Sequence, residues 1–279
     1  MLCDGRSASP AIVVLMEQAS VFDRVTESGG VRATLVAAAR AARAIVRAGD
    51  DPAARAAADP KGEMTHSWLF TGPPGSGRST TAKVFAQALL CTDPEIVGCG
   101  RCRGCETAKA GTHAEIQIAE TMGVSIGVDY TREELVRWAY ALPTTADWRV
   151  VIIPKADRLT PEAANALLKA VEEPPARTVF LMCAPTTDPA DFSVTLRSRC
   201  RHVYVPTPTS EEVVTALRIE HPELTVEQAE WAGTIANGHI GRAKKLATDE
   251  GTREWRGRAL DLVEAVFDPA TSYLRTREL

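Results

Sequence analysis

The sequence has no hydrophobic run long enough to cross a membrane, since none reaches the roughly 18 apolar residues that a spanning helix needs. The longest apolar run near the N-terminus, Ala11–Met16, is too short for a signal peptide, and Asp4 and Arg6 precede it in place of a basic cluster. Net charge is also small, because 32 basic and 36 acidic residues leave −4. These absences exclude a membrane protein and a polybasic nucleic-acid coat protein, and they favour a cytoplasmic protein.

Disulfides are not expected in a cytoplasmic chain, because the cytosol keeps thiols reduced, so the seven cysteines need another explanation. Four of them fall in one short segment, 91–105, with the spacing C-x₇-C-x₂-C-x₂-C. Thiolates at this density suit tetrahedral zinc, and neighbouring glycines let the backbone turn around an ion. An iron–sulfur cluster and free thiols are the alternatives. The predicted ligands of a closed, structural zinc site are Cys91, Cys99, Cys102 and Cys105.

Other candidate constellations are weaker. The five histidines show no spacing typical of a ligand pair or triad. Glu172 and Glu173 are neighbours on a predicted helix and face different ways, which indicates a solvated helix end and not a catalytic pair. Three basic residues of the cysteine segment are predicted to form its solvated rim: Arg101, Arg103 and Lys109. The cysteines outside the segment are expected to be unpaired, the last two of them buried: Cys3, Cys183 and Cys200.

Short apolar runs alternate with helical segments from residue 67 onward. Such alternation predicts an α/β fold with a parallel sheet covered on both faces. The predicted strands are Trp68–Thr71, Val150–Ile153 and Val179–Cys183, and the predicted helices between them are Arg78–Leu90 and Thr160–Glu173.

The segments on either side of this region have a different pattern. Val31–Arg47 predicts an amphipathic helix, whereas Gly49–Gly62 predicts an irregular surface connection because it contains Asp, Pro and Gly. After residue 208 the strands end, and three short helices are predicted, the second opened by a capping box. These helices are Ser210–Ile219, Thr225–Asn237 and Arg242–Thr248.

The segment Gly72–Ser79 (GPPGSGRS) follows a predicted strand and opens a predicted helix. This is the context of a G-x-x-x-x-G-K-[ST] phosphate-binding loop, in which glycines turn backbone N–H groups toward phosphate oxygens. Arg78 stands where the pattern has lysine, and arginine is larger and forked, so the exchange is not conservative. The predicted nucleotide-binding residues are Gly72, Pro73, Pro74, Gly75, Ser76, Gly77, Arg78, Ser79 and Thr80.

An ATPase of this class also needs carboxylates at the end of a later strand, for Mg²⁺ and for the attacking water. Here the strand Val150–Ile153 continues into Pro154 and Lys155, so neither position carries a carboxylate. Asp157 lies further on, in a predicted turn, and is a poor substitute. We expect weak ATP or ADP binding, poor Mg²⁺ retention and no hydrolysis by the chain alone.

Four features together resemble the AAA+ clamp-loader subunits of bacterial DNA polymerase III, most closely the delta-prime branch. Asn165–Pro175 (NALLKAVEEPP) is similar to the signature helix of this family, and Leu196–Cys200 (LRSRC) to its Ser-Arg-Cys motif. The cysteine segment lies where the family has a zinc module. Gly238–Ala243 (GHIGRA) resembles the lid segment, with Gly241 where motor subunits carry an arginine.

The resemblance implies a domain plan. Residues 1–21 would be an N-terminal extension, 22–206 an AAA+ P-loop domain with the zinc insertion at 91–105, and 207–250 a helical lid. Residues 251–279 would begin a helical collar, curtailed here, that in the family assembles a ring of subunits.

The resemblance also implies a function. The chain is expected to be a non-hydrolysing subunit that helps load the sliding clamp onto primed DNA, with tau/gamma and delta subunits as partners. Arg199 of the Ser-Arg-Cys motif would act in trans as an arginine finger for a neighbouring ATPase subunit. The alternative is a tau/gamma-like motor that hydrolyses ATP itself.

Overall fold

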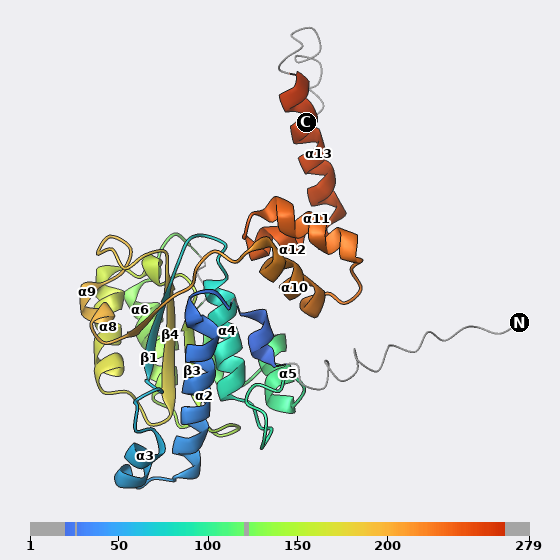
Figure 1. Ribbon diagram of the computed structural model, residues 1–279. Helices are drawn as coiled ribbons and strands as arrows, with labels where there is room; N and C mark the ends of the chain where they lie inside the picture. Colours follow the sequence, from blue (N-terminus) through green and yellow to red (C-terminus); the bar gives the residue numbers. More distant parts are fainter. Residues whose placement is uncertain (1–19, 26, 120–122, 266–279) are drawn as a thin grey trace, which may run out of the picture. The chain divides into compact units, whose positions relative to one another are not determined.

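A parallel sheet of five strands, in the order β2-β3-β4-β1-β5, organises the first part of the chain (Figure 1). The computed structural model describes residues 20–25, 27–119 and 123–265. Cys3 and nearly all of the expected N-terminal extension therefore lie outside the described residues. The strands are β1 Ser67–Thr71, β2 Ile116–Ile118, β3 Arg149–Ile153, β4 Thr178–Ala184 and β5 Arg201–Tyr204.

Helices precede, separate and follow the strands. Those of the first part are η1 Val21–Arg24, η2 Ser28–Gly30, α2 Val31–Arg47, α3 Pro52–Ala58, α4 Arg78–Leu89, α5 Arg103–Ala110, α6 Val128–Tyr130, η3 Thr131–Val136, α7 Arg137–Ala139, η4 Ala156–Arg158, α8 Pro161–Glu172 and α9 Val194–Arg197. The chain divides into two compact units after Thr207. The second unit contains α10 Ser210–Glu220, α11 Val226–Ala236, α12 Ile240–Thr248 and α13 Glu250–Ala265.

Successive side chains of the central strands point to opposite faces of the sheet and form two hydrophobic cores, one on each face. Trp68 and Phe70 of β1 pack on one face with α2 and α4, where Leu35 and Phe85 are buried. Leu69, between them, faces the other core, which α8 covers. Because successive strand side chains point to opposite faces, a strand buried on both sides reads as a continuous apolar run. The predicted α/β fold with a parallel sheet is confirmed.

The predicted helix and strand positions are confirmed to within a few residues, and the reasons are visible at the helix ends. The Thr160 hydroxyl accepts a hydrogen bond from Ala163 N and caps α8, while Thr225 and Gln228 form the predicted capping box of α11. One prediction is wrong: Gly49–Gly62 is not irregular throughout, because α3 lies within it. Asp51 caps this helix and Pro52 occupies its first turn, so the residues taken as breakers start a helix.

A buried ion pair fixes the edge of the sheet at β2 and β3. Glu115 is fully buried and lies 2.8 Å from Arg149, whose guanidinium carbon is 4.2 Å from the centre of the Trp138 ring. The same carboxylate accepts hydrogen bonds from the backbone and hydroxyl groups of Thr144 and Thr145. Burial tends to raise the pKa of Glu115, but the hydrogen bonds and the Arg149 charge outweigh it and lower the pKa to about 2.

We predict that Glu115→Gln lowers the free energy of unfolding by about 3–5 kcal/mol, because it leaves a buried guanidinium unpaired. The carboxylate has a pKa below its ordinary 4.5 in the folded chain, so its stabilisation is present above about pH 4.5. It is lost as the pH falls from there toward 2.

Urea unfolding at several pH values checks this, with Glu133→Gln as the control. Glu133 forms an exposed pair with Arg137, so its loss is expected to change stability by less than about 1 kcal/mol. Equal stability of the two variants at neutral pH would contradict the prediction.

Candidate functional site

The loop between β1 and α4 passes very close to the end of β5. A Cβ atom on Gly72 would lie 2.1 Å from the Val205 carbonyl oxygen, so a larger residue does not fit. Gly75 and Gly77 have φ values of 86° and 94°, a region that side-chain-bearing residues rarely adopt. The sequence thus forms a tight loop that ends at the N-terminus of α4, with Gly77 as its cap.

Several polar groups of this loop have no partner within the described residues. The Ser76 hydroxyl and Nη1 of Arg78 are buried without a hydrogen bond. In the same part of the chain, no backbone hydrogen bond engages the N–H groups of residues 77–80. Buried unpaired donors are costly, and unpaired N–H groups at a helix start are the groups that bind phosphate. The loop therefore has the donors that a nucleotide phosphate requires.

The end of β4 forms the neighbouring wall of this loop. Gly72 N–H donates to the Pro185 carbonyl oxygen, over a distance of 3.1 Å. Cys183, the residue before the last one of β4, is fully buried, and burial raises the pKa of its thiol to about 12 even though Arg78 and Ser79 act to lower it. Cys183 is thus an uncharged thiol beside the phosphate-binding loop, and its predicted burial is confirmed. The prediction that Cys200 is buried is wrong, because this residue, in the segment between α9 and β5, is only half-buried.

The end of β3 is where an ATPase of this class would hold its carboxylates. The chain here runs through Pro154 and the exposed Lys155 into the short helix η4. Asp157 lies in η4, not in a simple turn, and its side chain is exposed. Its negative charge adds to the effect of burial in raising the pKa of the Cys183 thiol.

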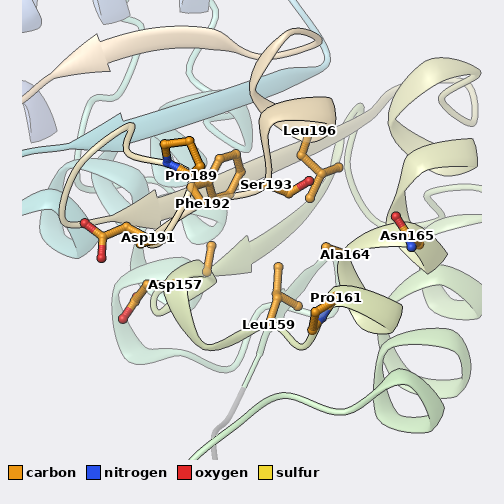
Figure 2. Close-up of a pocket in the computed structure, with 12 residues that line it drawn as sticks. Asp157, Leu159, Pro161, Ala164, Asn165, Pro189, Asp191, Phe192, Ser193 and Leu196 are labelled. Atoms are coloured by element: carbon orange, nitrogen blue, oxygen red, sulfur yellow. The ribbon is translucent and has the colours of Figure 1, made fainter.

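Asp157 also lines a separate pocket of about 380 Å³ between η4, the start of α8 and the loop before α9. Figure 2 shows Asp157 and Asp191 toward one end of this pocket and Asn165 toward the other, with Leu159, Phe192 and Leu196 nearby. The Asp191 carboxylate accepts a hydrogen bond from the Thr186 hydroxyl. None of the predicted nucleotide-binding residues lines this pocket.

Arg199 is exposed at the surface just after α9. Its Nη1 donates to the Thr195 carbonyl oxygen at 2.7 Å and to the Ser198 hydroxyl at 3.0 Å. Its Nη2 lies 2.5 Å from a carboxylate oxygen of Glu172, at the end of α8. This partner of Glu172 was not predicted from the sequence, because a contact between the ends of α8 and α9 has no local signal.

The four predicted zinc ligands come together. Their Sγ atoms all lie within 4.8 Å of one another, and those of Cys91 and Cys102 are 3.9 Å apart. Tetrahedral zinc with bonds of about 2.3 Å requires sulfur separations of about 3.8 Å, so a small contraction suffices. Among the described residues this is the one group of metal-binding type with three or more members.

Backbone N–H groups surround the sulfur atoms. The N–H groups of Cys99, Cys102 and Cys105 each donate to the sulfur of the preceding cysteine, at 3.3–3.4 Å. A hydrogen bond from the Cys105 thiol to the Cys91 sulfur is the main cause that lowers the pKa of the Cys91 thiol to about 4. The same hydrogen bond, together with burial, raises the pKa of the Cys105 thiol. The three backbone N–H donors favour the thiolate form of the sulfurs that they contact, and this form binds metal. The predicted rim residues are exposed: Arg101, Arg103 and Lys109.

The rest of the first unit holds this loop in place. Val21 N–H donates to the Gly98 carbonyl oxygen at 2.8 Å, and two arginines of α2 donate to other carbonyl oxygens of the loop. Gln87 of α4 donates to the Cys105 carbonyl oxygen at 2.7 Å. Gly104 lets α5 approach α4, because a Cβ atom there would lie 2.1 Å from the Leu90 carbonyl oxygen. Sequence patterns predicted the ligands but not these supports, which join segments far apart in the chain.

The second unit contains the predicted lid segment. His239 caps α12, its ring accepting a hydrogen bond from Arg242 N, and Gly241 is exposed in the first turn. In the described part of the chain, no helix has both the length and the apolar character needed to span a membrane.

Comparisons with known proteins agree with the resemblance. The chain is 30% identical over 210 residues to the DNA polymerase III subunit delta' of Pseudomonas aeruginosa, a match that covers 74% of this chain and 63% of that protein. It is 38% identical over 162 residues to the delta' subunit of Escherichia coli, covering 57% and 48% of the two chains. It is also 38% identical over 143 residues to the subunit gamma/tau of Mycobacterium tuberculosis, covering 50% and 24%. The matched part of the chain thus spans between about a quarter and three fifths of the length of these relatives.

Among solved structures, the Holliday junction branch migration motor RuvB of Thermotoga maritima matches with 16% identity and a TM-score of 0.47, covering 94% of this chain and 72% of that one. A likeness at this level carries no conclusion. The family model described as "DNA polymerase III, delta subunit" matches residues 56–209, which include β1, the phosphate-binding loop, the cysteine cluster and the Ser-Arg-Cys motif. The chain belongs to this family of DNA polymerase III subunits.

Proposed function

We propose that the chain is a delta-prime-type clamp-loader subunit that does not hydrolyse ATP and that supplies Arg199 to the ATP site of a neighbouring subunit. Its place in the complex would be beside tau/gamma and delta subunits, helping load the sliding clamp onto primed DNA. The observation that carries the proposal is the sequence Pro154-Lys155 directly after β3, where an ATPase holds carboxylates.

The proposed nucleotide-binding role of the loop is limited to binding. Backbone N–H groups at the start of α4 and the Arg78 guanidinium supply positive charge for phosphates, and Ser79 supplies a hydroxyl. No carboxylate follows β3 directly to hold Mg²⁺ or to activate water, and Lys155 has the opposite charge. Binding of ATP or ADP is therefore weak, and hydrolysis is absent.

The proposed cysteine site holds one structural zinc ion. Four sulfur ligands fill a tetrahedral site and leave no open position for catalysis. The zinc would stabilise the loop that lies between η1, α2, α4 and α5.

We predict about one equivalent of zinc in the purified chain. Cys99→Ser should lower it well below one, because a three-sulfur site binds less tightly, while Cys183→Ser should leave it unchanged because Cys183 lies on β4, outside the cluster. Elemental analysis after removal and re-addition of metal measures this. A content below about half an equivalent, or the absorption of an iron–sulfur cluster, would overturn the zinc proposal.

We predict that the isolated chain shows no ATP turnover above background at neutral pH. The tau/gamma-like motor is the competing function, because a gamma/tau subunit is among the relatives. Steady turnover that is lost in both Ser79→Ala and Asp157→Asn would establish the motor and reject the proposal. Highly purified protein and a coupled phosphate-release assay are required.

We predict that Arg199→Ala lowers the DNA- and clamp-stimulated ATPase rate of the assembled complex. An arginine finger contributes about 10³–10⁵ in rate at the one site that it serves, so the loss for the whole complex is partial. Arg197→Ala is the matched control, because the Arg197 side chain is also exposed and, within the described residues, donates only to the Thr187 carbonyl oxygen. If the Arg199→Ala complex assembles and turns over ATP at the unmutated rate, Arg199 is an ordinary surface residue.

A further inference from the structure

One side of α2 carries three arginines, Arg40, Arg43 and Arg47, at spacings of three and four residues. Residues at these spacings lie on the same side of a helix, and the three span about 10 Å along its axis. Together with Pro94, Glu95 and Val97 of the cysteine loop they line a groove of about 370 Å³, here called the arginine groove.

The arginine groove has an excess of positive charge. Within the described residues, no carboxylate oxygen lies within 4.0 Å of any of the three guanidinium groups. Glu95 is the one acidic residue among those that line the groove. Arg32, on the same helix, is different, because it is paired with both Asp23 and Glu27.

Two of the arginines are held in place by the opposite wall. Nη2 of Arg43 donates to the Ile96 carbonyl oxygen at 3.2 Å, and Nη2 of Arg47 donates to the Pro94 carbonyl oxygen at 2.9 Å. A guanidinium has five N–H groups, so most of those of the exposed Arg47 remain available after one such bond. Nη1 of Arg43 is buried and has no hydrogen-bond partner within the described residues, so the outward-facing N–H groups available to an anion come mainly from Arg40 and Arg47, both of which are exposed.

We propose that the arginine groove binds the phosphate groups of a nucleic-acid strand. The three arginines span about 10 Å, which equals three nucleotide steps of about 3.4 Å, so they lie within reach of phosphates in a run of four nucleotides. A guanidinium can donate two parallel N–H groups to the oxygens of one phosphate, so arginine side chains suit a phosphate ligand. None of the residues that line the groove is aromatic, so the contact is with the backbone and does not depend on base sequence.

This site adds to the proposed function and does not depend on it. Membership of a DNA polymerase III subunit family places the chain where nucleic acid is present. Neither Arg199 nor the phosphate-binding loop takes part in the arginine groove, and the binding requires no ATP.

The test is binding of the full chain to a fluorescent oligonucleotide, single-stranded in one arm and duplex in the other, over a range of salt concentrations. For a single strand with three phosphate contacts, the slope of log K against log salt should be about −2. Arg40→Gln should weaken binding about 3- to 5-fold and reduce the slope by about 0.7, because Arg40 is exposed and its charge lies in the groove. Arg32→Gln removes the same charge from the same helix, outside the groove, and should change neither quantity.

Several results would overturn the proposal. Equal weakening by Arg40→Gln and Arg32→Gln would show a general effect of net charge. An unchanged affinity in Arg40→Gln would show that the arginines only support the cysteine loop. If the affinity does fall, an unchanged zinc content and an unchanged free energy of unfolding in this variant exclude misfolding as the cause. Competition by polyglutamate as effective as that by an oligonucleotide of equal charge would show that the groove does not select phosphate.

Discussion

The parallel pairing of β1 with β4 on one side and β5 on the other is the constraint on which the rest depends. Both partners follow β1 by more than a hundred residues, yet their registers place Thr71 opposite Ala184 and Tyr204. The carboxyl ends of all three strands thus meet at one edge of the sheet, where ligands bind in open α/β sheets. The close approach of Gly72 to Val205 and of Cys183 to the phosphate-binding loop follows from this pairing.

At this edge of the sheet the charged groups suit phosphate binding but not ATP hydrolysis. Arg78 and the first N–H groups of α4 present positive charge, and Lys155 adds more at the end of β3. Phosphates need such charge, but water activation and metal retention need carboxylates close by. The first carboxylate after β3 along the chain is that of Asp157, which lies in η4 and is exposed, where water screens its charge. This distribution of charge supports the proposal that the loop binds a nucleotide without hydrolysing it.

Local patterns explain which parts of the molecule could be predicted from the sequence. Apolar runs predicted β1, β3 and β4, and caps such as Thr160 predicted the helices, because both depend on neighbouring residues. The strand β5 was not predicted, since only Val203 of its four residues is buried and the other three read as surface. The cysteine spacing indicated the metal ligands, whereas the Glu115–Arg149 pair joins residues 34 positions apart and has no local pattern. Tertiary pairs of this kind require the fold before they can be recognised.

The pairing of Arg199 with Glu172 is compatible with a role in trans. Both side chains are more than a third exposed, and exposed ion pairs contribute at most about 1 kcal/mol. A phosphate group carries more charge than one carboxylate and accepts paired N–H bonds from a guanidinium, so it can compete for Arg199. In the isolated chain, the hydrogen bonds to Thr195 and Ser198 restrict the Arg199 side chain to one region of the surface. A side chain held in this way would lose less conformational entropy in the proposed contact with the nucleotide of a neighbouring subunit.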